Sequence, residues 1–199
     1  MLNGITSQLS ARRGHFKMES GHHSETWFEL GTLFDDPDAV RPFVVELARR
    51  LSSQRPDAVC GPMTGGARLA GMVATEMGID SIVAERSETT GATGLFPVSY
   101  RIAEAERRTT RGRRIAIVDD AISAGSAVRG TYADLIACDG LPVALGALVV
   151  FGGAAARFAA DKGLALEAIE RMSFDMWRPA ECPLCEAGVA LETAAARSG

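Results

Sequence analysis

The chain has 199 residues, of which 47% are hydrophobic and 23% are charged, so it can fill the core of one large or two small globular domains. Its 21 basic and 25 acidic residues give a net charge of −4, which argues against a broad basic surface for nucleic acids. The most apolar stretch, Val143 to Phe151, is far shorter than the ~20 residues of a membrane span, and the N-terminus lacks the pattern of a signal peptide. We therefore expect a cytoplasmic protein that binds neither nucleic acids nor membranes.

The first 35 residues are predicted to form a small N-terminal hood. Gly14 to Leu33 is rich in histidine, glycine and aromatic residues without a clean hydrophobic period, which indicates an irregular or β-rich subdomain. A helix is then predicted over Pro37 to Ser52. Asp36 can cap this helix, and its apolar residues recur on one face at positions 40, 43, 44, 47, 48 and 51.

Strands and helices then alternate along the chain. Strands are predicted over 57–60, 81–84, 114–118 and 142–151, and helices over 66–77, 126–138 and 154–162. Strands that are apolar throughout and separated by helices are typical of a parallel sheet that is covered on both faces. We predict an α/β fold with a mostly parallel central sheet over residues 36–165, followed by a C-terminal extension over 166–199.

A polar stretch over residues 85–112 interrupts this alternation. It contains Gly91, Gly94 and Pro97, with a short candidate strand over Pro97 to Ile102. A long segment of this kind inside a domain is often a lid over a functional site, although an exposed β-hairpin explains its length equally well.

The run from Ile115 to Ala127, IAIVDDAISAGSA, predicts a ligand site at the end of a buried strand. The strand carries Asp119 and Asp120 to its C-terminal edge, where open α/β sheets bind their ligands. The Ser-Ala-Gly loop lets backbone N–H groups approach an anion, and the start of the next helix adds positive potential. Since two carboxylates can accept hydrogen bonds from vicinal hydroxyls or hold a hydrated Mg²⁺, we expect a sugar phosphate here.

Two other interpretations of this run are weaker. In the first, Asp119 and Asp120 have a purely structural role and cap the next element, but that role leaves the phosphate-ready loop unexplained. Receiver domains also begin with an Asp-Asp pair after a strand. Here the pair lies past the middle of the chain, and the next strand supplies no further Asp.

A second candidate anion loop lies between Asp57 and Ala67, in the run DAVCGPMTGGA. A strand leads there through a Gly/Pro turn into a helix, and Gly65 and Gly66 allow the backbone to approach an anion closely. A glycine-rich turn is equally common as an ordinary connection between two elements, without a ligand. The interpretation as an anion-binding loop is therefore supported only in combination with the first motif.

The run from Val118 to Ala127 resembles the phosphoribosyl-pyrophosphate signature of the type I phosphoribosyltransferases. The order of segments over residues 14–162 resembles orotate phosphoribosyltransferase: the hood with Ser20 to Ser24 and Trp27-Phe28, the Gly61-Pro62 loop, the lid and the acidic motif. This resemblance implies transfer of ribose 5-phosphate from phosphoribosyl pyrophosphate to a nitrogenous base. It also implies Mg²⁺ as cofactor, orotate as the leading base and a homodimer.

The same resemblance implies roles for individual residues. Asp119 and Asp120 would bind the ribose hydroxyls and Mg²⁺, and Arg86 would close over the pyrophosphate as a third catalytic residue. The pyrophosphate would lie against Thr64, Gly65 and Gly66. The whole phosphoribosyl-pyrophosphate site would comprise Asp119, Asp120, Ala121, Ile122, Ser123, Ala124, Gly125, Ser126 and Ala127.

By the same resemblance, Trp27, Phe28 and Ser123 would line the base pocket. From composition alone, the two adjacent aromatic residues are better explained as the core of the small hood. Both interpretations stay open at this point.

Several positions depart from the orotate pattern. Gly65 stands where these enzymes have a lysine, and the lid run that begins at Arg86 keeps only this arginine of their basic residues. Arg101, Arg107 and Arg108 are candidates to replace the lost charge, which stabilises the leaving pyrophosphate. The arginine that would meet the orotate carboxylate is absent, with Arg157 as the nearest candidate.

The missing lysines favour a rival function, a non-catalytic module that binds phosphoribosyl pyrophosphate or a nucleotide and regulates a partner. A different nucleotide-binding α/β fold is a third alternative. It predicts no selectivity for the pyrophosphorylated sugar over ribose 5-phosphate.

The spacing Cys182-Pro183-Leu184-Cys185 supplies half of a zinc site. Cys182 and Cys185 are therefore candidate Zn²⁺ ligands, but the histidines His15, His22 and His23 lie far away in sequence. A turn that merely carries two thiols is the main alternative. A redox pair is less well supported, because such a motif should begin a helix after a strand.

Overall fold

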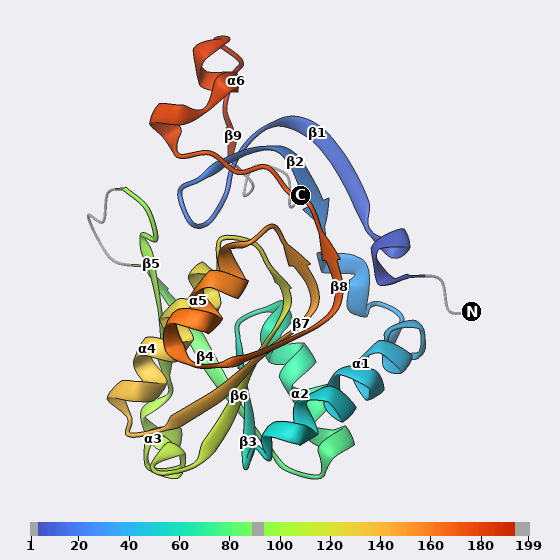
Figure 1. Cartoon of the computed structure of the whole chain (residues 1–199), viewed down its shortest axis with the longest axis vertical. Coiled ribbons are helices and arrows are strands. Elements are labelled where there is room, and N and C mark those ends of the chain that lie inside the picture. Colours follow the sequence, from blue (N-terminus) through green and yellow to red (C-terminus); the bar gives the residue numbers. More distant parts are fainter. Residues whose placement is uncertain (1–3, 89–93, 194–199) are drawn as a thin grey trace.

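The computed structural model describes residues 4–88 and 94–193, which form a central sheet beneath a smaller sheet built from both ends of the chain (Figure 1). The central sheet has the strand order β5-β4-β3-β6-β7-β8, and every neighbouring pair is parallel except β4 and β5. The strands are β3 (Ala58–Pro62), β4 (Asp80–Glu88), β5 (Val98–Ile102), β6 (Arg114–Ile122), β7 (Leu141–Phe151) and β8 (Ala165–Met172). The predicted α/β fold with a mostly parallel sheet is confirmed.

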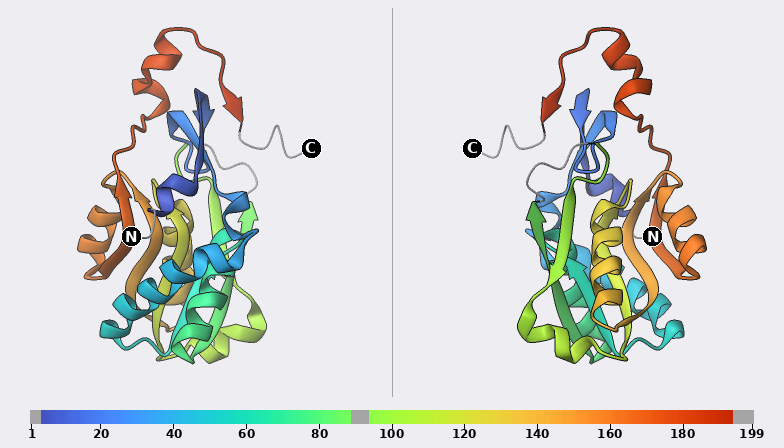
Figure 2. Two further views of the ribbon diagram at one scale, coloured as in Figure 1. Left: turned by 90° about the vertical axis from the view of Figure 1, so that its right-hand side faces the viewer. Right: turned by 90° about the vertical axis from the view of Figure 1, so that its left-hand side faces the viewer.

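Helices cover both faces of this sheet, because its inner strands are apolar on both sides. Val118 of β6 faces one core with α1 (Pro37–Leu51) and α2 (Gly65–Met77). Ile117, the neighbouring residue, faces the other core with α4 (Ser126–Ala137) and α5 (Ala154–Lys162). Figure 2 shows the two helical layers from opposite sides. A strand buried on both faces has no polar alternation, which is why β6 and β7 are continuous apolar runs.

Most predicted elements lie within a few residues of the observed ones, with three differences. β6 continues to Ile122, four residues beyond the predicted end, so the acidic pair lies inside the strand. β8 and the short helix α3 (Glu104–Thr110) have no counterpart among the predicted elements. The predicted lid contains a β-hairpin, since β4 extends to Glu88 and pairs antiparallel with β5. Gly91 of that lid lies outside the described residues.

The smaller sheet, which we call the hood sheet, has the order β2-β1-β9. β1 (Ser10–Lys17) and β2 (His23–Glu29) are antiparallel, and β9 (Glu192–Thr193), from the end of the chain, adds in parallel to β1. The C-terminal segment reaches the hood through a short helix, α6 (Pro183–Glu186), at the top of Figure 1. The domain boundaries at residues 35 and 165 stay predictions.

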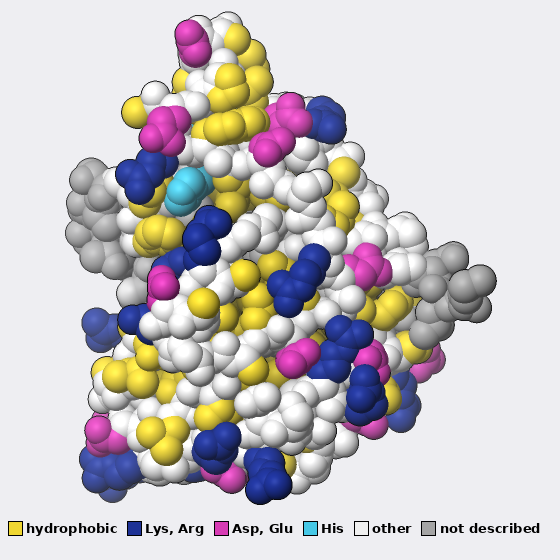
Figure 3. Space-filling model, in the orientation of Figure 1, with side chains coloured by type: hydrophobic (Ala, Val, Ile, Leu, Met, Phe, Trp, Pro, Cys, Tyr) yellow, Lys and Arg dark blue, Asp and Glu magenta, His cyan; other side chains and the backbone are white. Residues whose placement is uncertain are grey.

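Charges on the surface are mixed in sign. On the face in Figure 3, acidic and basic side chains are interspersed and form no broad basic patch. Within residues 4–88 and 94–193, none of the helices has the length and hydrophobicity needed to cross a bilayer.

Candidate functional site

A cavity of about 390 Å³ lies between the hood sheet and the C-terminal ends of β3 and β6. Since β3 and β6 are neighbours in parallel register, their following loops meet at the same edge of the sheet. The cavity brings together most of the predicted sugar-phosphate and pyrophosphate residues. They are Thr64, Gly65, Arg86, Asp119, Asp120, Ala121, Ile122, Ser123, Gly125, Ser126 and Ala127.

The acidic pair is the most buried charged group of this cavity. Asp119 is 8% exposed, and its Oδ1 accepts a hydrogen bond from the backbone N–H of Asp120 at 3.1 Å. Asp120 in turn accepts from the N–H of Ala121 at 2.8 Å. Burial and the neighbouring Asp120 carboxylate raise the pKa of Asp119 well above its usual range, and burial raises the pKa of Asp120. A cation or hydroxyl donors would stabilise the ionised pair.

Two helices begin at the cavity, which makes it a suitable site for anions. α4 begins at Ser126 after Gly125, whose φ of +82° is a left-handed conformation that favours glycine. α2 begins at Gly65, which also lines the cavity. Each helix start presents unpaired backbone N–H groups and the positive end of a dipole. The cavity can therefore hold two phosphate-like groups.

The two glycines at the start of α2 are packed against the acidic pair. A Cβ atom at Gly65 would overlap the Asp120 carboxylate, and one at Gly66 would lie 2.7 Å from Oδ1 of Asp119. The glycines therefore do more than allow a turn, because they let the loop approach the carboxylates. Gly66 itself does not line the cavity, whereas Met63, Thr64 and Gly65 do.

Glu19 is a cavity residue that the sequence analysis did not identify. It comes from the loop between β1 and β2 and accepts hydrogen bonds from Ser126 Oγ at 2.8 Å, Tyr100 Oη at 3.0 Å and Arg86 Nε at 3.1 Å. Burial and the adjacent Glu19 carboxylate raise the pKa of Tyr100, so this hydroxyl stays a donor. No motif signals Glu19, because its position depends on how the hood packs on the sheet.

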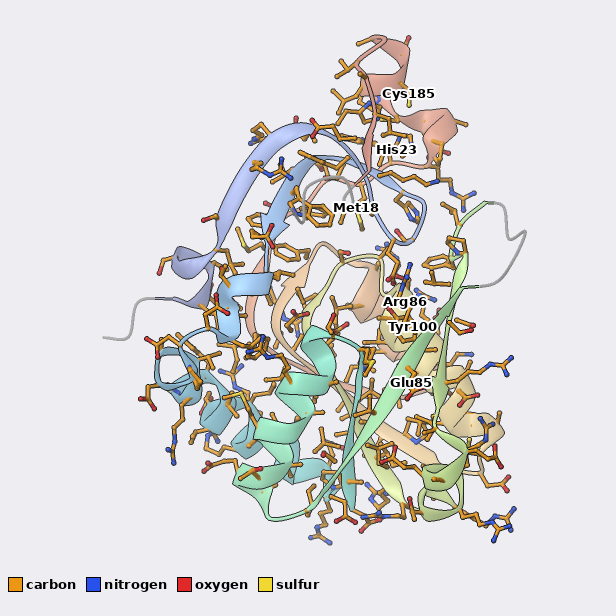
Figure 4. All side chains as sticks on the ribbon, turned by 180° about the vertical axis from the view of Figure 1, so that it is seen from behind. Met18, His23, Glu85, Arg86, Tyr100 and Cys185 are labelled. Carbon is orange, nitrogen blue, oxygen red and sulfur yellow. The ribbon has the colours of Figure 1, made fainter. Side chains whose placement is uncertain are left out.

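Figure 4 shows how these elements lie in space. Met18, in the loop between β1 and β2, lies above Arg86 and Tyr100 of the neighbouring strands β4 and β5. Residues of the hood and of the strands β4 and β5 thus line the same cavity.

A second cavity of about 230 Å³ adjoins the first, and both are lined by Met18, Trp27, Leu30, Ala121 and Ser123. All three predicted base-pocket residues, including Phe28, line the second cavity. The Phe28 ring also stacks on Phe151, with 4.7 Å between centroids. Phe28 therefore serves the hydrophobic packing beneath the hood and lines a cavity at the same time.

Comparisons with known proteins agree with this architecture. No protein-family profile matches the chain. The chain is 28% identical over 181 residues to the orotate phosphoribosyltransferase of Caldanaerobacter subterraneus subsp. tengcongensis, with 90% of this chain and 87% of that protein covered. It is 29% identical over 185 residues to the orotate phosphoribosyltransferase of Chlorobaculum parvum, with 93% and 89% covered.

Solved structures share the same arrangement of strands and helices. Adenine phosphoribosyltransferase from Thermoanaerobacter pseudethanolicus superposes with a TM-score of 0.65 at 16% identity, covering 84% of this chain and 98% of that one. Orotate phosphoribosyltransferase from Aeropyrum pernix gives a TM-score of 0.61 at 21% identity, covering 81% and 88%. The chain has the type I phosphoribosyltransferase fold and is related to orotate phosphoribosyltransferases.

Within this phosphoribosyltransferase fold, the arginines proposed to replace the missing lysines do not reach the cavity. Arg107 and Arg108 line a separate hollow on α3, where Arg107 Nη1 lies 3.2 Å from Asp134 Oδ2. Arg101 and Arg157 are also absent from the cavity wall. Among its described lining residues, Arg86 is the only basic side chain, against three carboxylates.

Three of the predicted site residues lie elsewhere. Cys182 and Cys185 are in the hood region, where they contact His15 and His23. Ala124 lines a shallow hollow beside Arg129 and Arg157 rather than the main cavity. The two cysteines thus lie apart from the sugar-phosphate residues.

Proposed function

We propose that this protein is a phosphoribosyltransferase that transfers ribose 5-phosphate from phosphoribosyl pyrophosphate to a nitrogenous base, with orotate as the leading candidate. One observation carries the proposal: two helix starts and a pair of buried carboxylates meet in a single cavity. A sugar with a phosphate at each end needs this combination. The relationship to orotate phosphoribosyltransferases supports the choice of base.

Each part of the cavity then has a distinct role. The loop from Ser123 to Ala127 and the start of α4 hold the 5-phosphate through backbone N–H groups. Thr64 and Gly65, at the start of α2, hold the pyrophosphate, and Arg86 balances its charge. Asp119 and Asp120 accept hydrogen bonds from the ribose hydroxyls. The ribose is thereby fixed between the leaving pyrophosphate and the base.

The transfer itself requires no nucleophilic side chain. A ring nitrogen of the base forms a bond to C1 of the ribose while the bond from C1 to the pyrophosphate oxygen breaks, and the proton of that nitrogen is released with the pyrophosphate. Asp119 and Asp120 stabilise the positive charge that develops on the ribose. Positioning by the two helix starts supplies most of the remaining rate increase.

The residues of the cavity fit a magnesium ion. Carboxylate oxygens are the protein ligands that Mg²⁺ prefers, and both acidic side chains have raised pKa values that a nearby cation would lower. Asp119 and Asp120 would hold the ion, directly or through its water molecules. When bound, Mg²⁺ neutralises pyrophosphate charge, which matters here because Arg86 is the only basic side chain of the described wall.

The second cavity suits a flat base. Trp27 and Phe28 supply aromatic surface, and Ser123 supplies a hydroxyl group beside it. Because this cavity shares residues with the first, a base bound here lies next to the ribose.

The proposal also includes a cytoplasmic location, which the sequence predicts, and a homodimer, which the resemblance implies.

The shortage of basic side chains favours one rival, a module that binds phosphoribosyl pyrophosphate without turning it over. Incubation with phosphoribosyl pyrophosphate, Mg²⁺ and a panel of bases, with pyrophosphate release as the readout, separates the two functions. We expect release with orotate and no release when Mg²⁺ is omitted. Binding of phosphoribosyl pyrophosphate without release for every base would replace the enzyme with the binding module.

A further inference from the structure

Four side chains that are distant in sequence meet in the hood: His15 of β1, His23 of β2, and Cys182 and Cys185 around α6. One nitrogen or sulfur atom from each lies within 4.8 Å of all the others. His15, His23 and Cys182 are buried, Cys185 is exposed, and the two cysteines form no disulfide. Figure 4 shows Cys185 of the C-terminal segment next to His23 of the hood.

The distances within this cluster match those of a tetrahedral zinc site. With Zn–N bonds of about 2.0–2.1 Å and Zn–S bonds of about 2.3 Å, two nitrogens lie about 3.3 Å apart and a nitrogen and a sulfur about 3.6 Å apart. The two histidine nitrogens are 3.0 Å apart, and the sulfur of Cys185 is 3.2 Å from His23 Nδ1. His15 Nε2 lies 3.4 Å from Cys182 Sγ and 3.7 Å from Cys185 Sγ.

The surroundings prepare His15 to act as a ligand. Its Nδ1 lies 2.8 Å from the carbonyl oxygen of Val189, which can only accept a hydrogen bond. Nδ1 must therefore carry the proton, and the lone pair is on Nε2, the atom that faces the two sulfurs. A backbone carbonyl that orients a histidine in this way is typical of metal sites.

The backbone around the cysteines forms a tight turn that holds both sulfurs on one side. The N–H of Glu186 donates to the carbonyl of Cys182, and the N–H of Gly188 donates to that of Cys185. Gly188 has a φ of +69°, which brings the chain back so that Val189 reaches His15. A short Cys-x-x-Cys turn of this kind is a common half of a structural zinc site.

We propose that His15, His23, Cys182 and Cys185 bind one zinc ion, which fastens the C-terminal segment to the hood sheet. Two thiolates and two imidazoles are a donor set that selects zinc among the common divalent ions. Four protein ligands leave no position for water or substrate, so the ion is structural. This site is separate from the cavity and does not depend on the proposed transferase activity.

The zinc site also explains what restrains the loop between β1 and β2, which lines the cavity. His15 and His23 flank the loop that carries Met18, Glu19 and Ser20 to the cavity wall. A metal ion that joins both ends of this loop to the C-terminal segment restricts the loop without occupying the cavity. Metal binding of this type contributes directly to folding free energy.

The first test is the metal content of the full-length protein, purified without chelator and analysed by elemental mass spectrometry. We expect one zinc per chain. Exchange with Co²⁺ should give the visible bands of tetrahedral cobalt and an ultraviolet thiolate-to-cobalt band. Removal of zinc with a chelator should lower the Tm, and Zn²⁺ should restore it while Mg²⁺ should not.

Matched variants distinguish this site from other thiols and histidines. C182S, C185S and H23Q should each lose most of the bound zinc, whereas C138S and H22Q should keep it, since neither Cys138 nor His22 belongs to the cluster. The Co²⁺ spectrum of the unmodified protein tests the site even if a variant fails to fold. Zinc far below one per chain after incubation with Zn²⁺, equal zinc in the cluster variants and the controls, or a Cys182–Cys185 disulfide in the purified protein would overturn the proposal.

Discussion

Asp119 and Asp120 lie side by side in a largely buried wall, where burial makes both carboxyl groups harder to ionise and the neighbouring Asp120 carboxylate makes Asp119 harder still. This is an unfavourable arrangement for a protein without ligand and a favourable one for binding hydroxyls or a cation. We expect D119N and D120N to weaken binding of phosphoribosyl pyrophosphate about 10- to 100-fold, since a hydrogen bond to a charged group is worth about 1.5–3 kcal/mol. Isothermal titration calorimetry would measure this loss, with D35N as an exposed control.

The same pair makes stability depend on pH. Because both pKa values are raised in the folded state, the folded protein binds more protons than the unfolded chain above the usual value of 3.8. The free energy of unfolding contributed by the pair is therefore highest below about pH 4 and falls as pH rises through the raised values.

D119N should remove the part of this dependence that comes from Asp119. In thermal unfolding without ligand, the variant should gain stability relative to the unmodified protein as pH rises from 4 to 8. A difference between the two proteins that stays constant over this range would contradict the assigned shifts.

The Glu19 carboxylate accepts a hydrogen bond from the hydroxyl of Ser126, at the start of α4. The proposed 5-phosphate binds at this same place. A carboxylate and a phosphate in the same place repel each other, so Glu19 must move or weaken binding. E19Q should therefore bind phosphoribosyl pyrophosphate roughly 5- to 10-fold more tightly at low salt, with a smaller gain at high salt as screening increases. Titrations at two ionic strengths check this, and weaker binding by E19Q would show that Glu19 assists the ligand.

Site residues that belong to a local motif can be predicted from the sequence, whereas site residues outside such a motif cannot. The acidic pair and its loop are adjacent in the chain, and a strand leading into a helix forces them to the sheet edge. Glu19 and Tyr100 are 81 residues apart and meet only because the hood packs on β5. No local pattern contains that information.

The start of α2 depends on glycine because it lies against the carboxylates of β6. G65A should displace Asp120 and weaken binding of phosphoribosyl pyrophosphate by at least about tenfold, since positioning errors of this size are costly. Gly71, on the same helix, is a matched control, because nothing lies within 4 Å of its Cβ position.

G71A should bind normally and be more stable by about 0.5–1 kcal/mol, the cost of glycine inside a helix. Binding and chemical denaturation measured on both variants separate the two effects. Normal binding by G65A would show that the loop tolerates a larger spacing from the acidic pair.

Elements with strong periodicity are predicted well, whereas the edge strand β8 is missed. α1 and α5 follow their apolar pattern and caps closely. β8 is a partly exposed edge strand in which Glu167, Glu170 and Arg171 interrupt the apolar residues, so it does not resemble the inner strands. β6 continues past its apolar run because β7 still pairs with it beyond Asp119. Pairing between strands, rather than residue type, makes residues 119–122 part of the strand.

The molecule consists of a well-buried central sheet and a hood sheet with only a two-residue third strand. We expect amide hydrogen exchange to be fastest in β1 and β2 and slowest in β6 and β7, since few buried contacts hold the hood. Phosphoribosyl pyrophosphate with Mg²⁺ should slow exchange in the loop between β1 and β2. Equal protection of both sheets without ligand would mean that the hood is as stable as the core.

The metal cluster shows why some features appear only at the scale of the whole chain. The sequence supplies a Cys-x-x-Cys half-site and distant histidines, with nothing to connect them. The connection comes from the C-terminal segment, which follows β8 in the chain and leads to the hood. There Trp177 pairs with His23. That path is set by the order of strands in the central sheet.

The hood contains residues from both ends of the chain, and this has a consequence for synthesis in the cell. On the ribosome, the strands of the central sheet emerge before Cys182, Cys185 and β9, which pack on the hood sheet. A nascent chain can therefore fold its central sheet early, but its hood is complete only after residues 182–193 have left the exit tunnel.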